Sequence, residues 1–321
     1  MLRPTIFAVV SCLALGPSFG QAPQYPAKPI SVIVSYSAGG NNDLRARQLA
    51  VPVSALLGKQ LITENRPGAS GNIGHAAVAK AVPDGYTLGI GAMGPLAVNG
   101  ALYPEMGFDA ASFAPIVLIE RAPLVLVTRA DKPYRSIADV VAAAKAKPGT
   151  IAVGNAGPGG AHHLAAKAFE QTAAIEFIHV PYKGGGPAAT ALLGGEIEMM
   201  FEQTYAALPS IQAGRTRPLA VTSEKRLPSL PNVPTMAELG YPQATISNWL
   251  GLIAPKGTPP PIVQKLNDAY NKALATPEIR ERIVAPGNEV GGGTPEEFAQ
   301  FIAKEADRWQ RLIKAAGIKV E

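Results

Sequence analysis

A run of small residues between an expected strand and an expected helix has the composition of an anion-binding turn. Ser37-Ala-Gly-Gly40 follows the apolar, β-branched stretch 30–34 and precedes Asn41-Asn-Asp43, three good N-cap residues. The pattern predicts a strand, a tight turn and a helix over 44–57. The unpaired N–H groups and positive dipole of a helix start attract anions. The same pattern is also typical of an ordinary βα connection that binds nothing.

The titratable side chains do not form an evident catalytic or metal-binding set. His162 and His163 are adjacent, and neighbours on a helix point about 100° apart, so we do not expect them to hold one metal ion. We expect one of them to face a cleft and the other to cap or pack. Glu202 could act as a general base, or bond a ligand hydroxyl, a water or loop N–H groups. No nucleophile or second acid is spaced to cooperate with it, so we predict no catalytic residue.

Gly89-Ile-Gly-Ala-Met-Gly94 has the glycine spacing of a dinucleotide-binding turn. That fold also needs an acidic residue about 20 positions further on, at the end of the next strand. Asp109 precedes its expected strand and Glu120 lies too far on. The chain contains no P-loop motif and no Gly-x-Ser-x-Gly motif. The sequence therefore favours neither a nicotinamide nor another cofactor.

The order of the expected elements predicts an α/β fold. After the first helix, strands are expected at 60–64, 86–90, 116–119, 124–128, 151–154, 177–180, 197–201, 219–222 and 249–254. Helices alternate with them, and three end the chain, at 259–275, 277–284 and 294–316. Ser136 and Thr294 begin two helices with capping boxes. The alternation predicts parallel sheets, and two similar glycine-rich turns, near residues 39 and 158, suggest two lobes facing each other across a cleft.

Composition and charge narrow the function further. The chain has 321 residues, of which 47% are hydrophobic and 17% charged, as in an ordered globular protein of one large or two ordinary domains. A net charge of +5 would attract small anions. Lys and Arg form no basic run and only 6% of residues are aromatic, which argues against a nucleic-acid partner.

The first 20 residues have the pattern of a secretory signal peptide. Arg3 precedes the apolar core 6–15, and Ser18-Phe-Gly20 is a small-residue cleavage site before Gln21. The single cysteine, Cys12, lies inside this segment. We therefore expect an exported, periplasmic protein whose mature chain has no disulfide and no thiolate metal site.

Many short motifs, in one order from Tyr25 to the end of the chain, resemble the Bug-type periplasmic solute-binding proteins, the receptors of tripartite tricarboxylate transporters. These motifs are Tyr25-Pro-Ala-Lys-Pro-Ile30, Ser37-Ala-Gly-Gly40 with Asp43, Glu64-Asn-Arg-Pro-Gly-Ala69, Pro83-Asp-Gly-Tyr-Thr-Leu88, Gly157-x-Gly159 with His163, His179-Val-Pro-Tyr-Lys-Gly184, Leu219-Ala-Val-Thr222, Pro231-x-Val-Pro-Thr235 and Gly257-Thr-Pro259.

The resemblance implies a two-lobe, type II-like periplasmic binding protein in which a hinge joins two mixed sheets flanked by helices. The first lobe would comprise residues 21–123 and 222–321, and the second residues 124–221. It implies a receptor, not an enzyme, that captures a small organic anion, a di- or tricarboxylate, for the membrane subunits of a transporter. We expect a monomer. A ligand-sensing subunit for a signalling partner is the alternative, and an exported enzyme would turn its ligand over.

The resemblance also implies a ligand-binding set in which backbone N–H groups matter more than arginines. It comprises Tyr36, Ser37, Ala38, Gly39, Gly40, Asp43, Gly91, Ala92 and Met93 in the first lobe, and Asn155, Gly159, His163, Tyr182, Lys183, Gly184 and Glu202 in the second. The chain departs from the family at Glu202, where Asp is common, at Pro158 and Gly160, and after Asn99, where Gly100 replaces a common proline. The identity of the ligand stays open.

Overall fold

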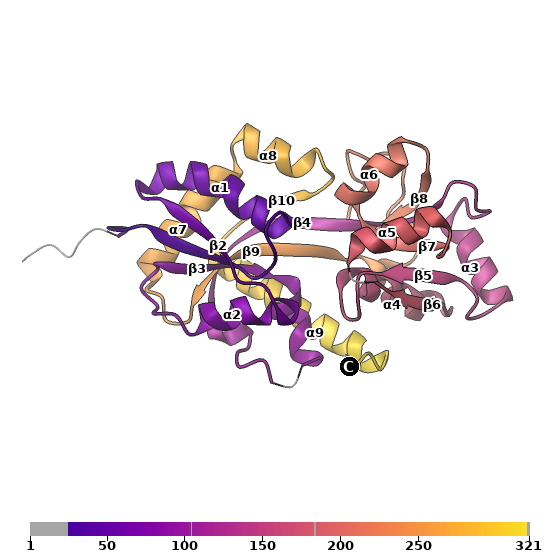
Figure 1. Ribbon diagram of the computed structural model, residues 1–321, viewed down its shortest axis with the longest axis horizontal. Coiled ribbons are helices and arrows are strands. Elements are labelled where there is room, and N and C mark those ends of the chain that lie inside the picture. Colours follow the sequence, from indigo (N-terminus) through magenta and orange to yellow (C-terminus); the bar gives the residue numbers. More distant parts are fainter. Residues whose placement is uncertain (1–24, 104, 183, 320–321) are drawn as a thin grey trace, which may run out of the picture.

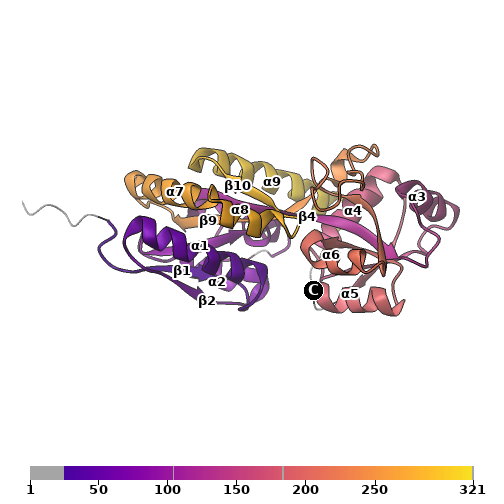
Figure 2. The ribbon, with the colours of Figure 1, turned by 90° about the horizontal axis from the view of Figure 1, so that it is seen from above.

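The computed structural model describes residues 25–103, 105–182 and 184–319. Within them the chain forms two lobes joined by the long strands β4 (Phe113–Arg129) and β9 (Ser247–Pro255) (Figure 1). The molecule is elongated, and β4 runs from one lobe into the other (Figure 2). The predicted two-lobe α/β fold is confirmed. The predicted signal peptide, 1–20, and Lys183 lie outside the described residues.

The first lobe is a sheet with helices on both faces. Three parallel strands, in the order β2-β1-β3, continue through the antiparallel β9 and β4, and β10 pairs with β4. The strands of this lobe are β1 (Ile30–Val34), β2 (Leu61–Asn65), β3 (Thr87–Ala92) and β10 (Glu289–Gly292). Its helices are α1 (Asn41–Leu57), α2 (Asn72–Ala79), α7 (Pro260–Leu274), α8 (Pro277–Val284) and α9 (Pro295–Ala315).

Apolar side chains from both faces of this sheet bury its strands. Leu49 of α1 and Tyr270 of α7 share one core cluster with Ile30. Val78 of α2 and Phe298 of α9 belong to another core cluster, and these two helices lie on the other side of the sheet from α1 and α7 (Figure 1). Because β1 and β3 are covered on both sides, they are mostly apolar and buried, as parallel strands usually are, whereas the edge strand β2 is polar from Thr63 onward. Because β1 and β3 are parallel neighbours, their carboxyl ends lie at the same edge of the sheet.

The second lobe repeats this plan. The far half of β4 pairs with β7 (Met199–Gln203) and β8 (Thr216–Val221), and β7 continues to β5 (Ala152–Asn155) and β6 (Ile178–Pro181). Helix α3 (Ile137–Ala146) and helix α4 (Ala161–Ala173) pack in one core cluster, whereas α5 (Gly185–Gly194) and α6 (Thr204–Gln212) pack in another. Within the described residues, no helix is long and apolar enough to cross a membrane.

One strand stands where the sequence predicted two. β4 is continuous through Arg121-Ala-Pro123, because this stretch pairs with β9 in an extended conformation. From Leu124 onward, β7 and β8 replace β9 as partners. The strand therefore belongs to both lobes, a role that the local apolar pattern does not reveal.

The stretch that follows β8 packs against core residues of the second lobe. Leu227, Leu230 and Val233 pack in the cluster that contains Val125 and Leu192, so this stretch lies with the second lobe. The Ile246 N–H donates to the Thr222 carbonyl oxygen over 2.9 Å. The next strand, β9, pairs with the first-lobe part of β4.

The capping residues in the sequence predicted where two helices begin. Ser136 and Thr294 form the predicted capping boxes with Asp139 and Glu297. Helix α1 begins earlier than predicted. Its N-cap is Gly40, which has no side chain to accept a hydrogen bond, and Asn41 to Asp43 form its first turn. Helix α6 and strand β10 were not predicted, because Thr204–Gln212 contains a proline and Glu289–Gly292 is short and rich in glycine.

Candidate ligand-binding cleft

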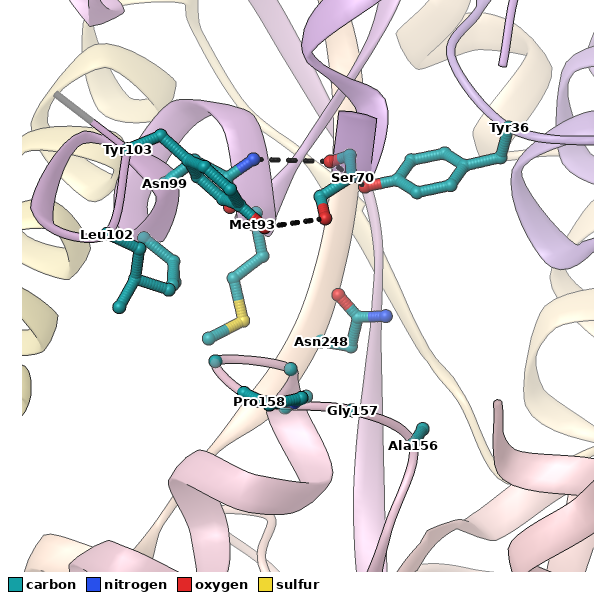
Figure 3. A pocket seen from close by; sticks show the side chains of 15 residues that line it. Tyr36, Ser70, Met93, Asn99, Leu102, Tyr103, Ala156, Gly157, Pro158 and Asn248 are labelled. Atoms are coloured by element: carbon teal, nitrogen blue, oxygen red, sulfur yellow. Dashed lines mark hydrogen bonds between the residues drawn. The ribbon is translucent and has the colours of Figure 1, made fainter. Parts of the chain in front are cut away.

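A cavity of about 360 Å³ lies between the two lobes. The first lobe lines it with Tyr36, Ser70, Met93, Gly94, Val98, Asn99, Leu102 and Tyr103; the second with residues 156–161; and β9 with Asn248. Figure 3 shows the loop that carries Ala156, Gly157 and Pro158 opposite Met93 and Asn248. None of these lining residues carries a charged side chain.

Hydrogen bonds hold the wall formed by the first lobe. Asn99 is 4% exposed, and its Nδ2 donates to the Ser70 carbonyl oxygen over 3.2 Å and to Asn72 Oδ1 over 2.7 Å. The Ser70 and Tyr103 hydroxyls are 3.0 Å apart (Figure 3). Ser70 has a φ of 54°, a left-handed conformation that costs a non-glycine residue about 1–2 kcal/mol. The surrounding bonds maintain this conformation, as is common where backbone strain accompanies function.

Tyr36 completes this wall directly after β1. Its hydroxyl lies 3.5 Å from the Ser70 carbonyl oxygen, and burial raises the pKa of Tyr36 to about 12, so the phenol stays protonated. A Cβ at Gly71 would lie 2.9 Å from that hydroxyl, so only glycine leaves room for the ring. Gly71 also has a φ of 90°.

The loop before α4 forms the opposite wall. Asn155, at the end of β5, accepts the Gly157 N–H on Oδ1 over 3.0 Å. His163, in the first turn of α4, accepts the Gly159 N–H on Nδ1 over 3.1 Å. Gly160 is the N-cap and provides no side-chain cap, so the first N–H groups of α4 are available at the cavity. Asn155 and His163 therefore stabilise the loop 156–160 through hydrogen bonds to its backbone N–H groups.

The neighbouring histidine has a different environment. Burial lowers the pKa of both His162 and His163 to about 4, so both rings are neutral near pH 7. The His163 ring contacts His179 edge-on, with centroids 4.9 Å apart. His162 instead packs beside Gly185, where an added Cβ would lie 3.2 Å from its Cε1. Among the described residues, no group of three metal-ligating side chains occurs.

The predicted anion turn of the first lobe lies beside the cavity and not in its lining. Ser37, Ala38, Gly39 and Gly40 are exposed. Asp43 is buried beneath them and accepts the Gly39 N–H on Oδ2 over 2.9 Å. Although burial alone would raise the pKa of Asp43, hydrogen bonds from its neighbours hold it below its ordinary value. Asp43 therefore positions the turn from below.

The predicted residues at the end of β3 and directly after it have different roles: Gly91 and Ala92 pack, and Met93 lines the cavity. A Cβ at Gly91 would lie 2.8 Å from Leu96, so this glycine permits close packing. The Ala92 N–H donates to His75 Nε2 over 3.4 Å, while Met93 lines the cavity. His75 Nδ1 also lies 2.8 Å from Ser35 Oγ. His75 thereby ties the ends of β1 and β3 together, a role that the sequence analysis did not find.

The remaining predicted residues lie outside the cavity lining. Tyr182 packs near Gly154, and Gly184 is the N-cap of α5, with a φ of 120°. Glu202 is 6% exposed, and burial raises the pKa of its carboxyl to about 7. The prediction missed several residues of the lining, among them Ser70, Val98, Asn99, Leu102, Tyr103 and Asn248. None of these side chains carries a motif of its own, and only the departure from the family after Asn99 had drawn attention to one of them.

The sequence and the structure are both similar to those of known periplasmic binding proteins. The family described as "Tripartite tricarboxylate transporter family receptor" matches residues 45–318. Protein BugT of Bordetella pertussis is 38% identical over 302 residues, which cover 94% of this chain and 93% of BugT. The structure of R. palustris Rpa4515 with adipate superposes with a TM-score of 0.81 at 35% identity, covering 92% of this chain and all of that one. Periplasmic binding protein BugD gives 0.77 at 36% identity, with the same coverage.

Proposed function

This chain belongs to the family of tripartite tricarboxylate transporter receptors, and we propose that it captures a small carboxylate in the cleft between its lobes. The resemblance to Bug-type solute-binding proteins is confirmed. The family is one of solute-binding receptors and not of enzymes. The adipate in the structure of the R. palustris relative supports a carboxylate as the ligand here.

The observation that carries the proposal is the uncapped start of α4 at the cavity. Residues 157–161 line the cavity, and no side chain caps this helix. Free N–H groups and the helix dipole favour an anion there. A hydrogen bond to a charged group is worth roughly 1.5–3 kcal/mol, so two such bonds would hold a carboxylate without an arginine.

The predicted ligand-binding residues divide by their proposed roles. We propose direct contacts for Tyr36, Met93 and Gly159, which line the cavity. Asn155, His163 and Asp43 would act by positioning the loops that they bond. The turn Ser37–Gly40 and the second-lobe residues Tyr182, Gly184 and Glu202 would approach the ligand if the lobes rotate toward each other. Gly91 and Ala92 would support Met93.

Transport and export belong to the same proposal. The receptor would deliver its ligand to membrane subunits of the tripartite type, as a monomer in the periplasm after removal of residues 1–20. The periplasmic description of the relative BugD supports this location. We place the lobe boundary at 123/124, where β4 changes partners, and the return crossing in β9. Residues 222–246 would then belong to the second lobe.

The start of α4 offers a sharp test. Ala161 is its first residue, and Gly160 before it has a φ of −71° and a ψ of 163°, which a following proline accepts. Ala161→Pro removes one N–H at a position where proline suits a helix. We expect it to weaken carboxylate binding at least about tenfold. Ala161→Gly, which keeps the N–H, should bind nearly as the wild type does.

Calorimetric titration with carboxylates and their neutral amides would measure these affinities, after unfolding and refolding to remove any bound ligand. Thermal unfolding of each variant would verify its fold. Binding of amides alone would overturn the proposed function. Unchanged carboxylate binding by a folded Ala161→Pro variant would overturn the assignment of the anion to the start of α4.

A further inference from the structure

One corner of the cavity, beside Gly94, presents hydrogen-bond acceptors, and the opposite end presents donors. At the first-lobe end, both contacts of Asn99 Nδ2 are made by oxygens of residues 70 and 72. Because the partner at residue 70 is a backbone carbonyl, the orientation of the Asn99 amide is fixed. Its Oδ1 therefore faces away from these partners, and among the described residues it accepts no hydrogen bond. Asn99 is itself 4% exposed and lines the cavity.

Gly94 marks the place where these acceptors converge. A Cβ built on Gly94 would lie 3.4 Å from the Tyr36 hydroxyl, 3.5 Å from Asn99 Oδ1 and 3.8 Å from the Ser70 carbonyl oxygen. Two of these three oxygens can only accept hydrogen bonds; the Ser70 carbonyl oxygen already accepts one from Asn99 Nδ2, so Asn99 Oδ1 is the acceptor that a ligand would meet. The third belongs to a phenol that already lies 3.5 Å from the Ser70 carbonyl oxygen. A carboxylate at this acceptor corner would face carbonyl oxygens, whereas a hydroxyl, amide N–H or ammonium would find acceptors.

The opposite end offers donors. The first N–H groups of α4 lie there, without a side-chain cap. Asn248 contributes from β9: its Oδ1 accepts the Trp249 N–H over 3.1 Å, which leaves its Nδ2 to donate. Between the two ends, Met93, Val98, Leu102 and Pro158 present apolar surface.

From this asymmetry we propose that the ligand is a monocarboxylate that carries a hydrogen-bond donor, a hydroxyl or amino group, at its far end. The carboxylate lies at the start of α4, the apolar middle lies against Met93 and Leu102, and the donor lies in the acceptor corner beside Gly94. This inference rests on the proposed function and narrows it, because a di- or tricarboxylate would place a second negative charge among carbonyl oxygens. Desolvating that charge next to Asn99 Oδ1 and the Ser70 carbonyl oxygen is costly.

A set of probes with equal chain length tests the proposal in the full-length protein. Adipate, hexanoate, 6-hydroxyhexanoate and 6-aminohexanoate differ only at the far end, and a four-carbon series from succinate to 4-aminobutanoate allows for a shorter site. At pH 7 we expect a hydroxy or amino acid to bind at least about tenfold tighter than the diacid of equal length. A diacid that binds as tightly or tighter would overturn this inference and leave the proposed function intact. If no carboxylate of either series binds, both fail.

Gly94→Ala provides the matched variant, because its methyl group would occupy the acceptor corner. We expect it to lower the affinity for the hydroxy or amino acid about tenfold, while hexanoate, which has no far-end group, loses little. Gly100→Ala is the control, since an added Cβ there meets only Met106 Cε at 3.7 Å. Thermal unfolding would verify the fold of both variants. Equal losses for all probes in Gly94→Ala would contradict the placement of the donor group.

Discussion

The Gly159 N–H donates a hydrogen bond to Nδ1 of His163 over 3.1 Å, four residues along the chain. Nδ1 therefore carries no proton, and the neutral ring holds its proton on Nε2. Burial, the main cause, lowers the pKa of His163 to about 4, which keeps this arrangement through neutral pH. Gly159 has a φ of 73° and lines the cavity. The imidazole thus stabilises a left-handed turn of the binding loop from its buried side.

Removing this acceptor should loosen the loop more than it destabilises the fold. We expect His163→Phe to weaken binding of the best carboxylate about fivefold, since a typical hydrogen bond contributes about 1 kcal/mol. His163→Asn, whose Oδ1 can accept the same N–H, should restore most of the affinity. Calorimetry measures the affinities, and denaturant unfolding measures the stability. Equal affinities in the two variants would contradict a positioning role for this ring.

Acid should destabilise the protein between pH 6.5 and 4. Burial, the first cause in each case, lowers the pKa of His75, His162 and His163 to about 4 from the ordinary 6.5. Below pH 6.5 these histidines become protonated in the unfolded chain, whereas in the folded chain they stay neutral until about pH 4. Each histidine then contributes a loss of up to about 1.4 kcal/mol for each pH unit. Unfolding by denaturant from pH 7.5 to 4.5 measures this slope.

Two variants separate the contributions to this slope. Nδ1 of His162 is buried and has no hydrogen-bond partner among the described residues, so His162→Leu should flatten the slope with little loss at pH 7.5. Glu202 acts in the opposite direction, because its pKa is raised to about 7 by burial and its protonation favours the folded chain. Glu202→Gln should therefore steepen the loss below pH 7. Constant stability from pH 7 to 5 in the wild type would exclude this account.

Local patterns predicted those parts of the fold that depend on local interactions. The capping boxes at Ser136 and Thr294 satisfy N–H groups within four residues, so composition alone locates them. The continuity of β4 depends instead on pairing with β9, more than 100 residues away in the chain, as between Arg121 and Trp249. No local signal carries that information.

The candidate site divides in the same way. Glycines at tight turns, such as Gly159, are visible in the sequence because positive φ favours them. Nothing in the sequence around Asn99 indicates that it forms the acceptor corner. Its role depends on the hydrogen bond from its Nδ2 to the Ser70 carbonyl oxygen, which only the fold brings within reach. His75 likewise gains its role only when α2 places it between Ser35 and Ala92.

The buried ion pair of Arg45 and Glu120 should dominate the stability of the first lobe. Their side chains are 4% and 0% exposed, and Arg45 Nη2 lies 2.7 Å from Glu120 Oε2. Asn288 Nδ2 donates to the same oxygen over 3.2 Å. Glu120→Gln leaves a buried guanidinium without its charge partner, so we expect a loss of roughly 3–5 kcal/mol in unfolding free energy.

An exposed pair supplies the comparison for this loss. Arg282 and Glu278 lie 2.8 Å apart on the surface of α8, with side chains 51% and 73% exposed. Glu278→Gln should change stability by about 0.5 kcal/mol or less, because exposed pairs are screened by water. Urea unfolding of both variants measures the difference. A Glu120→Gln loss as small as that of Glu278→Gln would show that the buried pair is structurally dispensable.

Leu102 and Gly159 connect the lobes at the cavity, and their coupling should be measurable. A Cβ on Gly159 would lie 2.3 Å from Leu102 Cδ1, so the leucine side chain occupies the space that glycine leaves open. Gly159→Ala also places a non-glycine residue at a φ of 73°, at a cost of about 1–2 kcal/mol. We expect this variant to displace Leu102, lower stability and weaken binding. In a Leu102→Ala background the steric part disappears and only the backbone cost remains.

A double-mutant cycle separates these two effects. The four proteins are the wild type, each single variant and the double variant, and denaturant unfolding gives the free energy of each. Contacting residues show coupling of about 0.5–3 kcal/mol, and relief of the clash makes the double variant more stable than the sum of the single losses. Additive losses would mean that Leu102 already lies away from Gly159 in solution. The lobes would then not meet at this point, and the cavity would be wider than 360 Å³.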